Sequence, residues 1–160
     1  MKWIKNIGLL LVLLVFASLL VGVDLWFFYH PKVIRTDGVI YGHRPGKELT
    51  MDIIRPDIGS NGLGIALMVS GGWKSGPPGS TPIEMMAPLL RRGYTIFAIS
   101  HISQPDATVM EIIEDMHTGI RYVRYHAKKD PSDPERLGVT GGSAGGHLSR
   151  MLATTGGMGS

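Results

Sequence analysis

The chain of 160 residues contains no cysteine. This absence excludes disulfide bonds, a lipid-modified cysteine anchor, thiolate zinc sites and a cysteine nucleophile together. If the protein is exported, its fold must therefore be stabilised by packing alone. The sequence also lacks internal repeats and low-complexity segments.

Charged residues are few, at 18% of the chain, and the formal net charge is +3. The basic residues are scattered, and no run of Lys and Arg alternates with aromatic residues as nucleic-acid binding requires. We therefore expect no nucleic-acid partner. Hydrophobic residues make up 44% of the chain, which favours a globular core over disorder. The length suits one ordinary domain.

No charge occurs from Ile7 to Val23, a run rich in Leu and Val that follows Lys2 and Lys5. A basic start before an apolar stretch is typical of a secretory signal. No clear small-residue cleavage site closes the run, and the aromatic group that follows Asp24 resembles an interfacial belt. We favour an uncleaved membrane anchor, with a cleaved signal peptide as the alternative and a buried core helix as a third reading. Residues 1–30 are set apart from the fold, and contact with a membrane is expected through residues 7–29.

The remainder, residues 31–160, alternates between short apolar runs and amphipathic segments. Val39–Tyr41 and Leu49–Arg55 predict a β-hairpin around the turn residues 42–46. Further strands are predicted at 65–69, 94–99 and 136–140, with helices at 81–93, 108–126 and from Ser143 to about Thr154. Thr81 is expected to cap the first of these helices, with Pro82 at its first position. The order predicts an α/β fold of three layers, with a mostly parallel central sheet between helices and an N-terminal antiparallel hairpin.

Gly141-Gly142-Ser143-Ala144-Gly145 matches the pattern G-x-S-x-G. It follows an apolar strand and precedes a predicted helix, which is the arrangement of a nucleophile elbow. The sharp turn would strain the backbone at Ser143, and Gly141 and Gly145 would let strand and helix pack closely. The alternative is a glycine-rich turn in which Ser143 only caps a helix.

A second glycine-containing loop, Ser70-Gly71-Gly72-Trp73, follows the strand predicted at 65–69. Its N–H groups, together with that of Ala144, would bind the oxygen of a reacting carbonyl as an oxyanion hole. A plain connecting loop is the alternative.

The stretch from Asp133 to Leu148 resembles the nucleophile region of α/β-hydrolase esterases. The nearest groups are the acetyl-xylan or feruloyl esterase-like and the hormone-sensitive-lipase-like families. The resemblance covers about residues 38–155 and implies that Ser143 is the nucleophile and that Gly72, Trp73 and Ala144 supply oxyanion N–H groups. The sequence departs from the family pattern in two places. No histidine precedes Gly71-Gly72, and Ser100-His101 replaces the usual Tyr-Arg pair.

The other members of a catalytic triad are not evident. In this fold the acid and then the histidine follow the serine, but residues 144–160 contain no Asp or Glu. His147 lies one helical turn after Ser143 and is expected to be part of the helix packing. His101 is a candidate for lining the pocket, His117 is expected to be structural, and Asp115 is expected to anchor its helix. We therefore interpret the chain as lacking the C-terminal part of the fold, with an open sheet edge, and as inactive or nearly so by itself.

Three functional hypotheses follow. The first is a hydrolase of small-molecule or carbohydrate carboxylic esters that forms an acyl-enzyme on Ser143, without metal or organic cofactor, in an exported or membrane-anchored protein. The second is a serine peptidase of the prolyl-oligopeptidase type, which shares the elbow. The third is a non-catalytic, membrane-anchored binding protein of the same fold.

Overall fold

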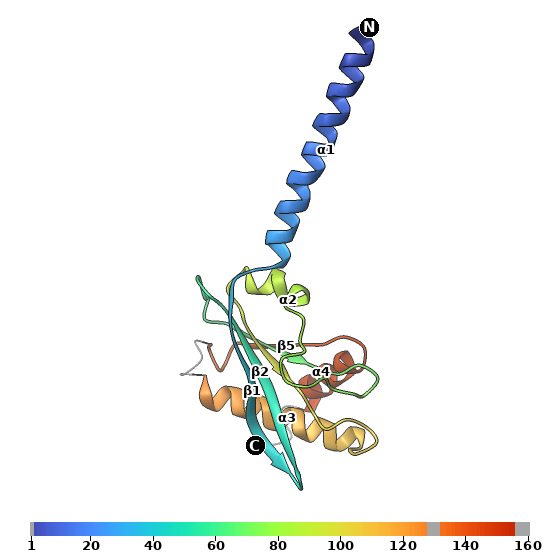
Figure 1. Cartoon of the computed structure of the whole chain (residues 1–160). Coiled ribbons are helices and arrows are strands. Elements are labelled where there is room, and N and C mark those ends of the chain that lie inside the picture. The colour runs from blue at the N-terminus through green and yellow to red at the C-terminus, as the bar shows by residue number, and fades with distance from the viewer. Residues whose placement is uncertain (1, 128–131, 156–160) are drawn as a thin grey trace.

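The computed structural model describes residues 2–127 and 132–155. Its first element is a long helix, α1 (Lys2–Tyr29). Figure 1 shows α1 projecting away from the domain, with its C-terminal end beside α2 (Ile83–Leu90). Its segment Asn6–Tyr29 is long and apolar enough to cross a membrane, and none of it is buried against protein. The described residues do not bury α1 as a core helix, and a signal sequence and an anchor both remain compatible with it.

The hairpin after α1 is longer than the sequence predicts. Strand β1 (Val33–Arg44) pairs antiparallel with β2 (Lys47–Pro56), and the turn is confined to Pro45 and Gly46. The expectation that residues 42–44 belong to the turn is wrong, because they pair within the strand. The register of β1 shifts at residues 36–39 and 40–42, which interrupts the alternating residue pattern. For this reason the sequence predicts a shorter strand than the structure shows.

The described sheet has the order β1-β2-β4-β3-β5, with β3 (Gly64–Met68), β4 (Thr95–Ile99) and β5 (Leu137–Thr140) mutually parallel. Because β2 is antiparallel to both β1 and β4, four of the five described strands run in one direction. The mostly parallel sheet is thus confirmed. Strand β5 is at the edge of the described sheet, and Val139 is 38% exposed there.

Helices lie on both faces of this sheet. On one face α2 (Ile83–Leu90) packs Met86 and Leu90 against Ile54 and Ile96. On the other face α3 (Val109–His126) and α4 (Ala144–Thr155) cover the larger core. That core contains Met51, Met68, Phe97, Ile99, Ile112, Met116 and Leu148 among others. The predicted three-layer architecture is confirmed.

Helix α3 begins where the sequence predicts, with Thr108 and Glu111 forming a capping box. The prediction for α2 is wrong at both ends. Pro82 is extended and occupies the N-cap position, and Thr81 makes no capping bond. The backbone oxygen of Thr81 accepts from Arg35 instead. The helix ends at Leu90, and residues 91–93 form a turn in which Gly93 has a φ of 88°.

A buried carboxylate ties the hairpin to the loop that follows β3. Asp52, in the middle of β2, is 4% exposed. Its Oδ1 accepts from the N–H of Gly38 at 3.1 Å, and its Oδ2 accepts from the N–H of Gly79 at 2.9 Å and from Arg35 at 3.1 Å. Three donors compensate for burying this charge. One side chain thus joins β1, β2 and the loop 69–82.

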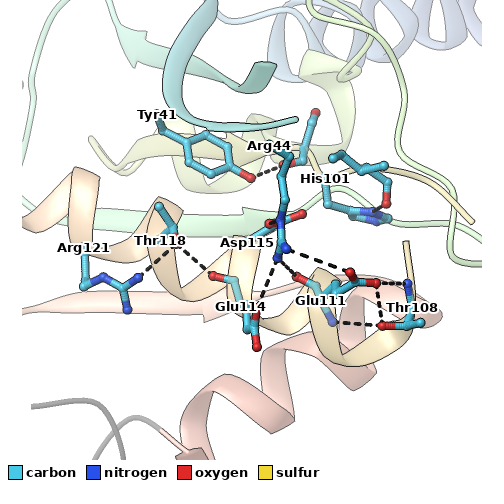
Figure 2. Close-up of polar contacts among 11 residues, drawn as sticks. Tyr41, Arg44, His101, Thr108, Glu111, Glu114, Asp115, Thr118 and Arg121 are labelled. Carbon is cyan, nitrogen blue, oxygen red and sulfur yellow. Dashed lines mark hydrogen bonds and ion pairs between the residues drawn. The ribbon is translucent and has the colours of Figure 1, made fainter. Parts of the chain in front are cut away.

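A second cluster of charges joins the hairpin to α3 (Figure 2). Arg44 donates from Nε to Asp115 at 2.7 Å, and from Nη2 to the Glu111 carbonyl at 3.0 Å and to Glu114 at 3.2 Å. Asp115 is 1% exposed, so Arg44 faces a carboxylate that is held in the core. Burial raises the pKa of Asp115, while Arg44 opposes that rise. The expectation that Asp115 anchors its helix is confirmed.

Arg44→Ala is expected to destabilise the complete protein by about 3–5 kcal/mol near pH 8, because it leaves a buried carboxylate without its cation. The variant raises the folded-state pKa of Asp115 further above the unfolded value. Protonated Asp115 therefore stabilises the folded variant below the unfolded pKa of this carboxyl group. That stability is lost as pH rises through the folded pKa, so the variant is less stable at pH 8 than at pH 4.5. Urea unfolding at pH 4.5 and pH 8 measures this. The double variant Arg44→Ala/Asp115→Asn should lose the added pH dependence, and an unchanged pH profile in Arg44→Ala would contradict the assignment.

Candidate active site

The turn between β5 and α4 exposes a single hydroxyl. Ser143 is solvent-exposed and has φ 53°, in the left-handed region that a residue with a Cβ rarely adopts. Its carbonyl accepts from the N–H groups of Gly146 at 3.0 Å and His147 at 3.2 Å, so α4 starts directly behind it. This strained exposure is the geometry of a nucleophile elbow.

The two elbow glycines are required by close backbone contacts. A Cβ on Gly145 would lie 2.3 Å from the Met68 carbonyl oxygen, and one on Gly141 would lie 2.5 Å from the backbone carbon of Gly145. By contrast, a Cβ on Gly142 would meet nothing within 4 Å. The glycines at both ends of the motif therefore permit the close approach of β5, α4 and the end of β3.

The loop after β3 turns back within two residues. Gly71 and Lys74 exchange backbone hydrogen bonds of 2.9 and 3.1 Å, with Gly72 and Trp73 at the tip. Both tip residues have positive φ, 56° and 63°. Such a conformation is ordinary for glycine but strained for tryptophan, and strain of this kind gathers at functional sites.

This loop and the elbow lie together. The N–H of Gly145 donates to the carbonyl of Ser70 at 3.1 Å, and the rings of Trp73 and His147 meet edge to face with centroids 5.5 Å apart. In the part of the chain that the structure describes, no residue accepts from the backbone N–H groups of Gly72, Trp73 or Ala144. Three backbone N–H groups without an acceptor among the described residues thus lie in the loop after β3 and in the elbow itself.

His101 is buried beneath the loop. Its Nδ1 lies 2.8 Å from the Ile102 carbonyl, which only accepts, so Nδ1 carries the proton. Its Nε2, 2.9 Å from Ser70 Oγ, then accepts from that hydroxyl. Burial lowers the pKa of His101, which keeps the imidazole neutral near pH 7. His101 is 7% exposed and supports Ser70; that it lines a substrate pocket stays a prediction.

Sequence reasoning missed the other supports of this loop. The Ser75 hydroxyl donates to the Val69 carbonyl at 2.7 Å, and the backbone N–H of Ser75 donates to Ser103 Oγ at 3.0 Å. The N–H of Gln104 donates to the Trp73 carbonyl at 3.1 Å. The bonds to Ser103 and Gln104 link residues that are far apart in the chain, and no local pattern in the sequence predicts them.

Two further histidines lie on the helices near this site. His147 is on α4 with its ring against Trp73, and His117 Nε2 lies 2.9 Å from Thr155 Oγ1, linking α3 to α4. Burial, aided by Arg121, lowers the pKa of His117. Among residues 2–127 and 132–155, no cluster of His, Asp and Glu is suited to a metal ion.

A hollow of about 1280 Å³ lies between the hairpin, α3, α4 and the edge strand β5. Leu137, Val139, Met151 and Leu152 line part of it. Ser143 is not among the residues that line this hollow.

Solved structures of known proteins share this fold. A truncated form of a carbohydrate esterase from gut microbiota superposes with a TM-score of 0.65 at 29% identity, covering 76% of this chain and 44% of that one. Esterase 2 of Thermogutta terrifontis superposes with a TM-score of 0.60 at 26% identity, covering 74% of this chain and 42% of that one. Together with the elbow, these similarities place the chain in the class of α/β-hydrolases.

Within that class, the family model BD-FAE matches residues 51–159, and the chain belongs to this family. Among curated proteins, it is 32% identical to a probable carboxylic ester hydrolase, LipM, of Mycobacterium tuberculosis over 74% of this chain. It is 28% identical to a probable isoprenylcysteine α-carbonyl methylesterase of Oryza sativa over 77% of this chain. The chain spans 28% of the length of each of these two relatives.

Proposed function

We propose that Ser143 is the nucleophile of a carboxylic ester hydrolase. The observation that supports this most strongly is the hydrogen bond from Gly145 to Ser70, which holds the strained elbow against the glycine-containing loop. Because of that contact, the exposed hydroxyl and three unpaired N–H groups lie in adjoining segments. A helix N-terminus behind Ser143 adds a partial positive charge.

In the proposed reaction, Ser143 Oγ attacks the ester carbonyl carbon and loses its proton to a general base. The carbonyl oxygen becomes an oxyanion that accepts from the N–H groups of Gly72, Trp73 and Ala144. The carbon–oxygen bond to the alcohol then breaks, and the alcohol leaves with the proton. Water attacks the resulting acyl-enzyme and releases the acid.

The general base and its acid partner are proposed to follow Ser143 in the complete protein, in the order typical of this fold. No described histidine lies in hydrogen-bond contact with the Ser143 hydroxyl. The described residues would thus supply the nucleophile and the oxyanion hole but no base. This is consistent with the short share of its relatives that the chain spans.

For the substrate we propose a carbohydrate ester or a small-molecule ester. The similarity to a carbohydrate esterase supports this. For α1 we propose an uncleaved anchor in an exported protein. Its apolar span, its exposure and the absence of a clear cleavage site support this second proposal.

Hydrolysis of p-nitrophenyl acetate and of a proline-linked peptide p-nitroanilide by the complete protein tests the reaction class. We expect turnover of the ester and none of the peptide. Turnover of the peptide alone would instead support a peptidase. Failure of both, together with no labelling of Ser143 by a fluorophosphonate probe, would indicate a non-catalytic protein.

A further inference from the structure

The connection between α1 and the sheet is too short to be a flexible tether. Tyr29 ends the helix and Val33 starts β1, so only residues 30–32 lie between them. Three residues span at most about 10 Å when fully extended. If α1 crosses a bilayer, the domain must therefore sit directly at the bilayer surface.

The foot of α1 is also fixed to α2. Arg91 Nε donates to the Phe28 carbonyl at 2.6 Å, and the Arg91 guanidinium lies 5.3 Å from the centroid of the Phe28 ring. His30 lies 3.5 Å from Glu84 of α2. Figure 1 shows α2 immediately beneath the end of α1. These contacts define which end of the domain faces the bilayer.

A loop completes this end of the domain. The N–H of Asp57 donates to the Lys32 carbonyl at 3.2 Å, and Asn61 Nδ2 donates to the Arg92 carbonyl at 2.8 Å. The loop 57–61 is thus held between the foot of α1 and the end of α2. We call Lys32, Ile58, Met85, Arg91 and Arg92 the collar.

The collar has the composition of a surface that meets lipid. Ile58 is 88% exposed and Met85 is 69% exposed, although both are apolar. Lys32, Arg91 and Arg92 are exposed cations. Two acids, Asp57 and Glu84, lie near them, and Glu84 is 3.5 Å from His30. Apolar side chains among cations suit the interface of a bilayer with anionic head groups.

We propose that the collar is a second membrane contact, in which Ile58 and Met85 enter the head-group layer and Lys32 and Arg92 meet lipid phosphates. This inference rests on the proposed role of α1 as an anchor. The collar would fix the orientation of the domain relative to the bilayer, which α1 alone would leave free to vary.

This orientation fixes where the active site faces. Strand β1 starts at the α1 end and runs in the same direction as β3, β4 and β5, and Ser143 follows the carboxyl end of β5. Ser143 therefore lies at the edge of the sheet opposite the collar. A strand of the length of β3, Gly64–Met68, separates the two edges by about 16 Å. The substrate would be an ester that arrives from the aqueous side, not a lipid within the same bilayer.

Single-cysteine labelling tests the collar, because the chain has no cysteine of its own. The variants Ile58→Cys and Met85→Cys of the full chain are each labelled with an environment-sensitive fluorophore. They are placed in vesicles of phosphatidylcholine and phosphatidylglycerol that contain a shallow spin-labelled lipid, which quenches a fluorophore in the head-group layer. Met110→Cys is the matched control, since Met110 is 64% exposed but lies at the start of α3, at the opposite edge. Leu13→Cys, with deep spin-labelled lipid, reports on the anchor.

We expect quenching at positions 13, 58 and 85 and none at 110. Lys32→Ala/Arg92→Ala should reduce quenching at 58 and 85 in these vesicles while leaving position 13 quenched. If the label at position 13 is quenched but the labels at positions 58 and 85 behave like the one at position 110, the collar does not contact the membrane. The anchor role of α1 would still be supported. An unquenched label at 13 would overturn the anchor and the collar together.

Discussion

Ser143→Ala in the complete protein is expected to lower kcat/KM for p-nitrophenyl acetate by at least about 10³-fold, since loss of the nucleophile leaves only the oxyanion hole and substrate binding. The side chain is exposed, so the fold should be unaffected. Covalent labelling by a fluorophosphonate probe should disappear in parallel. Steady-state kinetics and intact-mass spectrometry measure the two effects.

Ser149→Ala is the matched control for this experiment. Ser149 is on the same helix, but its hydroxyl donates to the Gly145 carbonyl at 2.8 Å and is not at the elbow. We expect it to keep both turnover and labelling. A Ser143→Ala protein that still takes up the probe would show that another residue is the nucleophile.

Gly145→Ala is expected to lower the free energy of unfolding by about 3 kcal/mol or more. The added methyl group would lie 2.3 Å from the Met68 carbonyl oxygen, which is backbone and has no rotamer to move aside. Relief of the clash must separate α4 from the end of β3, which would also break the contact between Gly145 and Ser70. Urea denaturation of the variant and the parent protein measures the loss.

Gly142→Ala, in the same turn, separates a steric effect from a general intolerance of the elbow. A Cβ at position 142 meets nothing within 4 Å, so we expect a change within about 0.5 kcal/mol. Equal losses in the two variants would contradict the close packing of α4 against β3.

The elbow was the most predictable part of the site, because its evidence is local. An apolar strand, glycines on either side of a serine and a following helix all lie close together in the chain. The structure gives Ser143 the strained φ and both glycines the close contacts that this pattern predicts. The helix at 108–126 was predictable for the same reason, since its apolar spacing and its cap are adjacent in the chain.

The supports of the site were less predictable, because they join distant residues. Asp52 meets a partner 27 positions away, and Arg44 meets one 71 positions away. The positive φ of Trp73 is held by tertiary contacts to Gln104 and His147, against the local preference of tryptophan. The start of α2 was also mispredicted: Pro82 occupies the N-cap, and the Thr81 carbonyl accepts from the distant Arg35.

The buried Asp52 has a consequence for how much of the chain the fold needs. The family match starts at residue 51, so it includes Asp52 but neither Arg35 nor Gly38, which provide two of its three donors. A protein trimmed to the matched segment would leave this carboxylate in the core with only the Gly79 N–H to solvate it. The first hairpin strand therefore belongs to the smallest unit of this chain that can be expected to fold, although it lies outside the matched segment.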